Sequence, residues 1–305
     1  MSKPRCGVVA VVLLCAAAPA QAAWEELKAM PTPRSETAAA HLEGKIYVPG
    51  GLGGMSAFEA YDIAKNAWDT LAPLPAGRHH LAVAAHGGRI YVFGGANLLW
   101  QPTPSAWAYD PRTNRWETLA DLPEPRYAAA AVALGEYLYV VGGDGPSGRL
   151  LRYHPASGRW TMLAETRARR EHTAAAVLGG QLHVVGGRFG GSGELNSTER
   201  YDSARNEWSP GPPLGTARGG FGLVCASDAL WAFGGEVIMT GRETLGSAEL
   251  LRRGATAWAP GPNLPLPLHG VPAVAAEGYL YILGGSEQAG AVENRGRVFR
   301  LRTPP

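Results

Sequence analysis

The stretch that decides the fold is residues 89–116, which read RIYVFGGANLLWQPTPSAWAYDPRTNRW. A run of β-branched and aromatic residues leads into a Gly-Gly doublet, and a Tyr then stands seven residues before a Trp. The apolar run predicts a short buried strand and the doublet predicts a tight turn. Asp110-Pro111 and Asn114 predict a second turn, so the stretch reads as three consecutive short strands.

The same pattern recurs along the whole chain. Six Gly-Gly doublets, spaced by 44, 48, 44, 48 and 50 residues, begin at Gly50, Gly94, Gly142, Gly186, Gly234 and Gly284. The Tyr and Trp follow as Tyr61/Trp68, Tyr109/Trp116, Tyr153/Trp160 and Tyr201/Trp208, whereas the fifth repeat keeps Trp258 but has Leu251. Alanine-rich runs before the doublets (Thr37–Leu42, Ala128–Val132, Thr173–Leu178) predict one more strand, so each repeat reads as four strands, a to d.

The order Gly-Gly, Tyr-Asp, Trp with a period near 50 residues resembles the Kelch motif, and its six copies cover residues 23–305. The resemblance to bacterial exported Kelch-repeat proteins implies an all-β fold, a six-bladed β-propeller. The last repeat stops before its Trp, and residues 24–30, WEELKAM, match the segments that begin at Trp68 and Trp116. We therefore expect the N-terminal segment to supply strand d of the sixth blade and to close the ring.

Residues 1–22 have the pattern of a secretory signal peptide. Two basic residues precede an apolar run over residues 8–18, and Ala20-Gln21-Ala22 provides a cleavage site. The apolar run is too short to span a membrane. We expect one Kelch domain over residues 23–305, a mature chain that starts at Ala23, and a periplasmic or extracellular location.

The composition argues against several classes of function. The leader holds two of the 28 basic residues and none of the 26 acidic ones, so the mature chain carries 26 of each sign. That balance argues against a nucleic-acid binder or a protein of anionic membranes. Cleavage leaves Cys225 as the one cysteine, so we expect no disulfide and a small apolar role for this side chain. With no metal or cofactor motif in the sequence, we also expect no metal, no cofactor and a monomer.

The predicted topology places two sets of loops on one face of the propeller, which we call face X. If strand a leaves this face, strand b returns to it, so the d–a and b–c loops share it. Sixteen residues before each doublet, at the start of strand a, stand Arg34, Arg78, Arg126, Arg170, Arg218 and Leu268. The five arginines could form an anion-attracting funnel at the channel mouth. Alternatively, each could tie one blade to the next through carbonyl or carboxylate groups.

The position two residues further on varies between the repeats. It holds Glu36, His80, Ala128, His172, Gly220 and Gly270. In the Kelch-type adaptors of ubiquitin ligases, which the repeat pattern resembles, this position faces the ligand. Framework positions repeat between blades and site positions need not, so we expect Glu36, His80 and His172 to contact a ligand. The b–c loops add Trp100, Phe189, Glu236 and Arg242, which suit a carbohydrate or a protein partner.

Glu236 directly follows a doublet and Arg242 stands six residues later. This arrangement is similar to that of the sialate mutarotases (N-acetylneuraminate epimerases), which are exported six-bladed Kelch proteins. The resemblance implies that Glu236 is a general base at the anomeric hydroxyl and that Arg242 binds the sugar carboxylate. The chain lacks the long blade insertions of those enzymes. We therefore predict a scaffold that binds a protein or carbohydrate through face X, with a sugar-acid mutarotase as the alternative.

Overall fold

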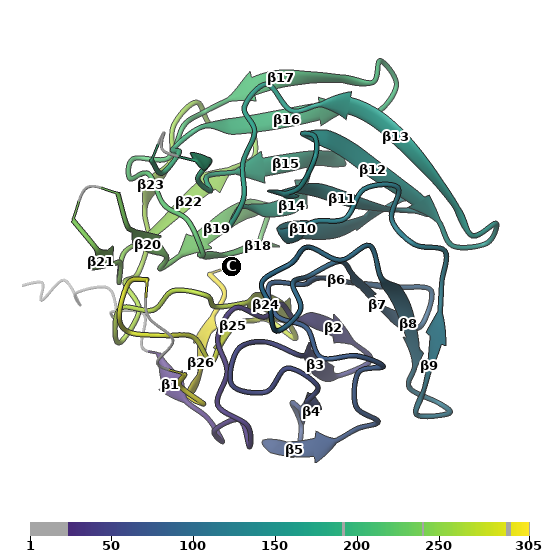
Figure 1. Ribbon diagram of the computed structural model, residues 1–305. Coiled ribbons are helices and arrows are strands. Elements are labelled where there is room, and N and C mark those ends of the chain that lie inside the picture. The colour runs from purple at the N-terminus through teal and green to yellow at the C-terminus, as the bar shows by residue number, and fades with distance from the viewer. Residues whose placement is uncertain (1–23, 191–192, 240, 291–293, 305) are drawn as a thin grey trace, which may run out of the picture.

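The computed structural model describes residues 24–190, 193–239, 241–290 and 294–304. The signal peptide expected over residues 1–22 and the cleavage before Ala23 lie outside these residues. Within them, six four-stranded antiparallel sheets are arranged around a central axis (Figure 1). The prediction of an all-β, six-bladed propeller is therefore confirmed. No helix in the described part of the chain has the length and apolar character needed to cross a bilayer.

Each blade runs from an innermost strand a to an outermost strand d. Blade 1 consists of β2 (Ala40–Leu42), β3 (Lys45–Pro49), β4 (Phe58–Asp62) and β5 (Ala67–Thr70). Blade 2 consists of β6 (Ala82–His86), β7 (Arg89–Phe93), β8 (Ala106–Asp110) and β9 (Arg115–Thr118). Blade 3 consists of β10 (Tyr127–Leu134), β11 (Tyr137–Asp144), β12 (Arg149–His154) and β13 (Arg159–Glu165). Blades 4 and 5 consist of β14 (Ala174–Leu178), β15 (Gln181–Val185), β16 (Thr198–Asp202) and β17 (Glu207–Gly211); and β18 (Gly222–Ala226), β19 (Ala229–Phe233), β22 (Ala248–Arg252) and β23 (Ala259–Pro260). The b–c loop of blade 5 adds a two-stranded ribbon, β20 (Glu236–Val237) with β21 (Glu243–Thr244).

The two ends of the described chain meet in the sixth blade. Its strand order is β24 (Ala273–Ala276), β25 (Tyr279–Leu283), β26 (Val298–Arg302) and β1 (Glu25–Glu26). Figure 1 shows β1 beside β26, and Glu25 lies opposite Arg300 in the antiparallel register. The indole Nε1 of Trp24 donates a hydrogen bond to the carbonyl of Asn263 in blade 5 at 2.7 Å. The N-terminal strand therefore closes the ring, as the repeat alignment predicts.

The repeated Trp and Gly residues join neighbouring blades. Each indole donates to a carbonyl of the adjacent blade at 2.7–3.1 Å, in the pairs Trp24–Asn263, Trp68–Lys28, Trp116–Ala72, Trp160–Ala120, Trp208–Ala164 and Trp258–Pro212. The second glycine of every doublet donates its N–H to the residue at the arginine position of the next blade; for Gly51 the acceptor is the Arg78 carbonyl. A Cβ on Gly51 would lie 2.7 Å from the Ser35 carbonyl, so this close approach requires glycine.

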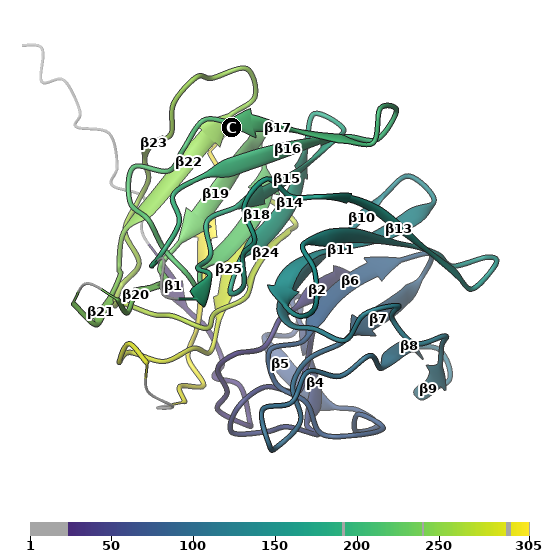
Figure 2. The same ribbon diagram turned by 45° about the horizontal axis from the view of Figure 1, so that its top comes forward.

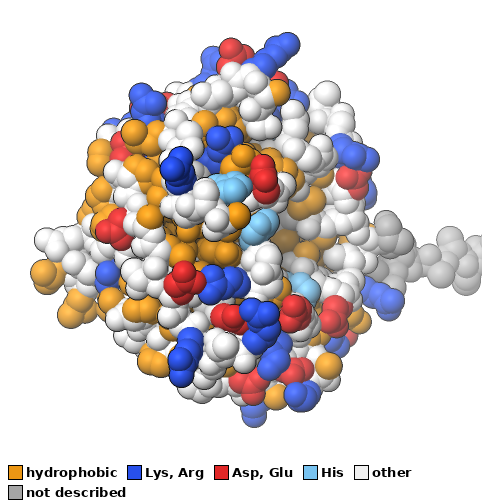
Figure 3. Space-filling model, turned by 90° about the vertical axis from the view of Figure 1, so that its right-hand side faces the viewer, with side chains coloured by type: hydrophobic (Ala, Val, Ile, Leu, Met, Phe, Trp, Pro, Cys, Tyr) orange, Lys and Arg blue, Asp and Glu red, His pale blue; other side chains and the backbone are white. Residues whose placement is uncertain are grey.

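The hydrophobic core is divided into layers between adjacent blades. One layer joins Tyr47 and Phe58 of blade 1 with Val92 and Tyr109 of blade 2. Cys225 is half-buried against a similar layer between blades 4 and 5. The strands a contact one another around the axis (Figure 2), which leaves room there for small side chains and explains their alanines. On the side of the molecule shown in Figure 3, acidic and basic side chains are intermixed.

Trp24→Ala should lower the free energy of unfolding by about 2–4 kcal/mol, the lower part of the range for large aromatic truncations, because Trp24 is only partly buried. The substitution removes the bond to Asn263 and the edge-on packing against Phe233, whose ring centroid lies 5.6 Å away. Urea denaturation measures the change, with exposed Leu98→Ala as the control. Equal midpoints for the two variants would show that β1 contributes little to closure.

Candidate functional site

The six residues two positions after the arginine position surround the channel on face X. All six have a left-handed backbone, with φ between 48° and 61°: Glu36, His80, Ala128, His172, Gly220 and Gly270. The N–H groups of Glu36, His80, Ala128, Gly220 and Gly270 each donate to the carbonyl of the preceding ring member, for example His80 to Glu36 at 2.7 Å and Glu36 to Gly270 at 3.0 Å. Glycine adopts this conformation without strain, but four blades place a larger side chain there. Three of those side chains are ionisable, which is typical of strain retained at a functional site.

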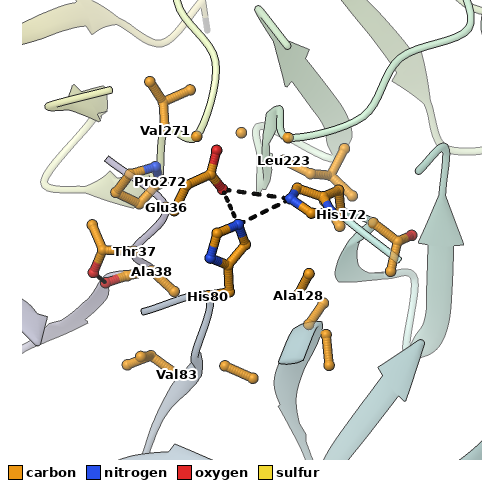
Figure 4. Close-up of a pocket in the computed structure, with 18 of the residues that line it drawn as sticks. Glu36, Thr37, Ala38, His80, Val83, Ala128, His172, Leu223, Val271 and Pro272 are labelled. Atoms are coloured by element: carbon orange, nitrogen blue, oxygen red, sulfur yellow. Dashed lines mark hydrogen bonds and ion pairs between the residues drawn. The ribbon is translucent and has the colours of Figure 1, made fainter. Parts of the chain in front are cut away.

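The ring residues and the first residues of the strands a line a cavity of about 150 Å³ on the propeller axis. Small side chains such as Ala38 and Ala129 form its wall, while Glu36, His80 and His172 supply its polar groups (Figure 4). Gly270 makes room for the carboxylate, because a Cβ there would lie 2.6 Å from Glu36 Oε1. The three side chains that the sequence analysis expects to contact a ligand therefore lie together at this cavity.

Glu36, His80 and His172 point toward one another from three different blades (Figure 4). The two imidazole Nε2 atoms are 3.0 Å apart. Glu36 Oε2 lies 3.2 Å from Nε2 of His80 and 3.9 Å from Nε2 of His172. The side chains of Glu36, His80 and His172 are 10%, 2% and 8% exposed, respectively. Three polar atoms therefore converge on one point beside the cavity.

A chain of ion pairs extends from this point across face X. His269 Nδ1 lies 3.3 Å from Glu36 Oε1 and 3.3 Å from Glu236 Oε2. The other Glu236 oxygen accepts a bond from Arg188 Nη1 at 2.7 Å, and Arg188 Nε donates to Glu171 Oε1 at 2.9 Å. Glu171 Oε2 in turn contacts His172 Nδ1. Side chains from five blades thus form one continuous network.

His79 and Trp100 cover the other side of the cluster. His79 Nδ1 lies 2.5 Å from His80 Nδ1, and His79 Nε2 lies 3.1 Å from the Asn97 carbonyl. The Trp100 ring packs edge-on against His79, with 4.4 Å between centroids, and it is 49% exposed. Trp100 therefore contacts the cluster and remains accessible to solvent at the same time.

Burial and neighbouring charges give the histidines different protonation preferences. Desolvation lowers the pKa of His80 and, aided by His80 and Arg188, holds that of His172 well below its usual value. Burial and His80 lower the pKa of His79 to about 4. Desolvation also acts on His269, but the Glu36 and Glu236 carboxylates outweigh it and raise its pKa. Desolvation opposes the charge on Glu36, yet the three histidines around it lower its pKa. His269 is thus the histidine of this cluster best suited to carry a proton.

The arginines behave differently from the variable ring. Arg34, Arg126, Arg170 and Arg218 are at most 1% exposed. Each donates through Nη1 to the first carbonyl of its own blade's doublet and pairs through Nη2 with a Glu at 2.6–2.8 Å: Glu59, Glu124, Glu199 and Glu249, respectively. Their backbone carbonyls join the preceding blade. The arginines are therefore structural, but the guanidinium groups brace their own blades and the backbone carbonyls make the link to the neighbouring blade. Buried, paired guanidinium groups do not form an open funnel. Desolvation lowers the pKa of Arg34 to about 10.

The remaining predicted residues lie nearer the rim of face X. Arg78 is half-buried, donates to Thr103 Oγ1 at 3.1 Å and stacks over Trp107. Phe189 is half-buried under the guanidinium of Arg169. Arg242 is exposed and has a left-handed backbone. The arginine that contacts Glu236 is Arg188. The roles that the resemblance implies for Glu236 at the anomeric hydroxyl and for Arg242 at the sugar carboxylate stay predictions.

Sequence reasoning missed four members of the network: His79, Glu171, Arg188 and His269. Three of them occupy the position directly after the arginine position, and Arg188 directly follows a doublet. In the structure these two positions face each other as isolated β-bridges, for example Glu171 with Arg188 and Gly219 with Glu236. Comparing the repeats at these two positions, directly after the arginine position and directly after the doublet, would have predicted all four residues on face X.

Comparisons with known proteins agree with the fold. The family model described as the KLHDC2/KLHL20/DRC7 Kelch-repeats domain matches residues 13–187, and the Kelch motif model matches residues 169–215. The chain belongs to the Kelch-repeat family. No curated protein matches the sequence. Among solved structures, the one titled "Structure of YjhT" is similar to this chain with a TM-score of 0.78 and 19% sequence identity. The match covers 90% of this Kelch chain and 96% of that one, and at this identity it shows the shared fold alone.

Proposed function

We propose that this Kelch propeller binds a small polar ligand, such as a sugar or sugar acid, on face X and transfers protons on it. The observation that carries the proposal is the position of His269, whose Nδ1 lies 3.3 Å from a carboxylate oxygen of both Glu36 and Glu236. A protonated imidazole between two carboxylates offers a proton donor and a proton acceptor in one relay. Such an arrangement of titratable groups beside a cavity supports acid–base chemistry on the bound ligand.

Sugar mutarotation requires both groups. A base takes the proton of the anomeric hydroxyl while an acid protonates the ring oxygen, and ring closure on the other face reverses both transfers. Glu36 lines the cavity, and Glu236, at 1% exposed, connects to it through His269. Exposed Arg242 and Trp100 lie on the same face, where a guanidinium suits a sugar carboxylate and an indole suits a sugar ring. The signal peptide expected over residues 1–22 would place this activity outside the cytoplasm.

The experiment is a ligand screen by saturation-transfer NMR with neutral sugars and sugar acids, including N-acetylneuraminate. The proposal expects at least one ligand to bind and its signal to decrease in Glu36→Gln. Each hit is then followed by anomer-exchange NMR. A complete absence of sugar and sugar-acid binding would contradict the proposal.

Binding without chemistry is the second candidate, favoured by one surface feature. Leu98, Leu99 and Trp100 are 76%, 74% and 49% exposed at the tip of the blade 2 b–c loop. Exposed apolar groups beside charged ones are typical anchors for a protein partner. If face X docks a protein, Trp100→Ala should weaken that complex by about 1–3 kcal/mol, measured by calorimetry. The exposed Met162→Ala, in β13 at the outer edge of blade 3, is the control, and equal affinities for both variants would exclude this loop as the anchor.

A further inference from the structure

Glu36, His80 and His172 bring more hydrogen-bond acceptor atoms to their meeting point than donor protons. The hydrogen-bond partners of each imidazole nitrogen show this. His79 Nε2 faces a carbonyl oxygen, which only accepts, so this nitrogen carries the proton and His79 Nδ1 is an acceptor. His80 Nδ1, 2.5 Å away, must then be the donor of that pair. A neutral His80 therefore presents an unprotonated Nε2 to the cavity.

The same reasoning applies to His172 from the opposite side. Its Nδ1 contacts Glu171 Oε2, and a carboxylate oxygen only accepts, so Nδ1 carries the proton. Arg188 Nε donates to the other Glu171 oxygen, Oε1, at 2.9 Å. A neutral His172 thus also presents an unprotonated Nε2, 3.0 Å from that of His80. With Glu36 Oε2 beside them, three lone pairs meet without a donor among them.

We infer that Glu36 Oε2, His80 Nε2 and His172 Nε2 bind a divalent first-row transition ion, with zinc as the ion of choice. Zinc binds imidazole nitrogen and carboxylate oxygen at about 2.0–2.2 Å, so tetrahedral ligand atoms are about 3.3 Å apart. The observed separations of 3.0, 3.2 and 3.9 Å surround that value. Two imidazoles and one carboxylate favour such an ion over calcium or magnesium, which take oxygen ligands.

The surroundings of the cluster agree with this assignment. Glu171 on His172 and His79 on His80 supply the outer contacts that orient metal-binding imidazoles. The carboxylates of Glu171 and Glu236 pair with the Arg188 guanidinium, whereas Glu36 Oε2 faces the two imidazoles. The cavity beside the three ligand atoms gives access and leaves a coordination position for water or a ligand oxygen.

A second group, Glu36 Oε1, Glu236 Oε2 and His269 Nδ1, also has metal-like spacing. His269 Nε2 faces the Gln288 carbonyl at 2.9 Å and so carries a proton, and a second proton on Nδ1 lies between the two carboxylates. In this group the imidazolium of His269 forms ion pairs with the carboxylates of Glu36 and Glu236, so the three side chains are paired with one another without a metal ion.

The test uses the mature protein after treatment with a chelator, in the absence of any sugar. Calorimetry with Zn²⁺ should show one ion per chain, and Co²⁺ should give the visible absorption of a site with nitrogen ligands. Glu171→Gln should weaken Zn²⁺ binding by about 10–100-fold and His172→Ala by more. His154→Ala, on the opposite face beside Ser157, is the matched control and should bind as the wild type does. Circular dichroism without metal checks that each variant is folded.

A second measurement keeps the inference testable if the variants fail to fold. Long-range ¹H–¹⁵N spectra of the wild type report each histidine ring, and Zn²⁺ should shift the Nε2 resonances of two rings while leaving His154 unchanged. Failure of the wild type to bind Zn²⁺ or Co²⁺ one-to-one, or full binding by His172→Ala, would overturn the assignment. Since no substrate is present, this result is separate from the success or failure of the proton-transfer proposal.

Discussion

Glu236→Gln should lower the rate of catalysed anomer exchange by about 10²–10⁴-fold, the contribution expected of an acid–base group. Glutamine keeps the shape of the side chain but removes its negative charge. Arg188 and the Gly290 N–H donate to different oxygens of Glu236, so the single amide oxygen of glutamine keeps one of these two bonds. His269 loses one of the two carboxylates that favour its protonated form.

The split between kcat and KM distinguishes a role in proton transfer from a role in shaping the site. Proton transfer predicts a fall in kcat with little change in KM, because the ligand still binds. Glu243→Gln, an exposed change in the neighbouring strand β21, is the matched control and should leave both constants unchanged. Equal kcat values for Glu236→Gln and Glu243→Gln would remove Glu236 from the relay.

Arg170→Ala should cost about 3–5 kcal/mol of unfolding free energy, the range for breaking a buried ion pair by removing one partner. The truncation leaves the Glu199 carboxylate buried at 4% side-chain exposure and removes bonds to the carbonyls of Gly186 and Ser197. Arg78→Ala is the comparison from the same repeat position, because Arg78 is half-buried and stacks on Trp107. It should cost about 1 kcal/mol or less.

Urea denaturation of the two arginine variants, with ligand affinity measured on the same samples, separates the two roles considered for this position. A structural role predicts unequal losses of stability and an Arg78→Ala variant that still binds ligand. Similar stability for both variants together with lost affinity would instead favour an anion funnel on face X.

The fold was predictable because the propeller requires the same residue types at the same positions in every blade. Gly51 and its equivalents are needed wherever backbones approach, and Trp68 and its equivalents wherever blades join, so their spacing gave six blades and the closing role of Trp24. The arginine position repeats for the same reason. Its side chains are framework, and repetition alone did not separate that role from ligand binding.

The site was only partly predictable because its residues do not all occupy the same position in the repeat. Glu36, His80 and His172 stood out as variation at one repeat position. Arg188 did not, although the bridge between Glu171 and Arg188 recurs with the same spacing in other blades. Its link to Glu236 joins neighbouring blades through side chains, and the spacing of residues does not tell which side chains meet there. Arg242 was named from its distance after Glu236, and it lies exposed just before β21, so its role on a sugar carboxylate stays a prediction. Side-chain protonation depends on such contacts and therefore required the structure.

The most direct test of the central claim, that the face X network performs proton transfer on a small sugar acid, is exchange NMR of N-acetylneuraminate with the wild-type protein. The anomeric resonances are followed at a pH where uncatalysed exchange is slow, with heat-denatured protein as the blank. The account predicts exchange faster than in buffer, and predicts that Glu36→Gln loses most of the acceleration. An exchange rate equal to the buffer value, for this and every other sugar that binds, would contradict it.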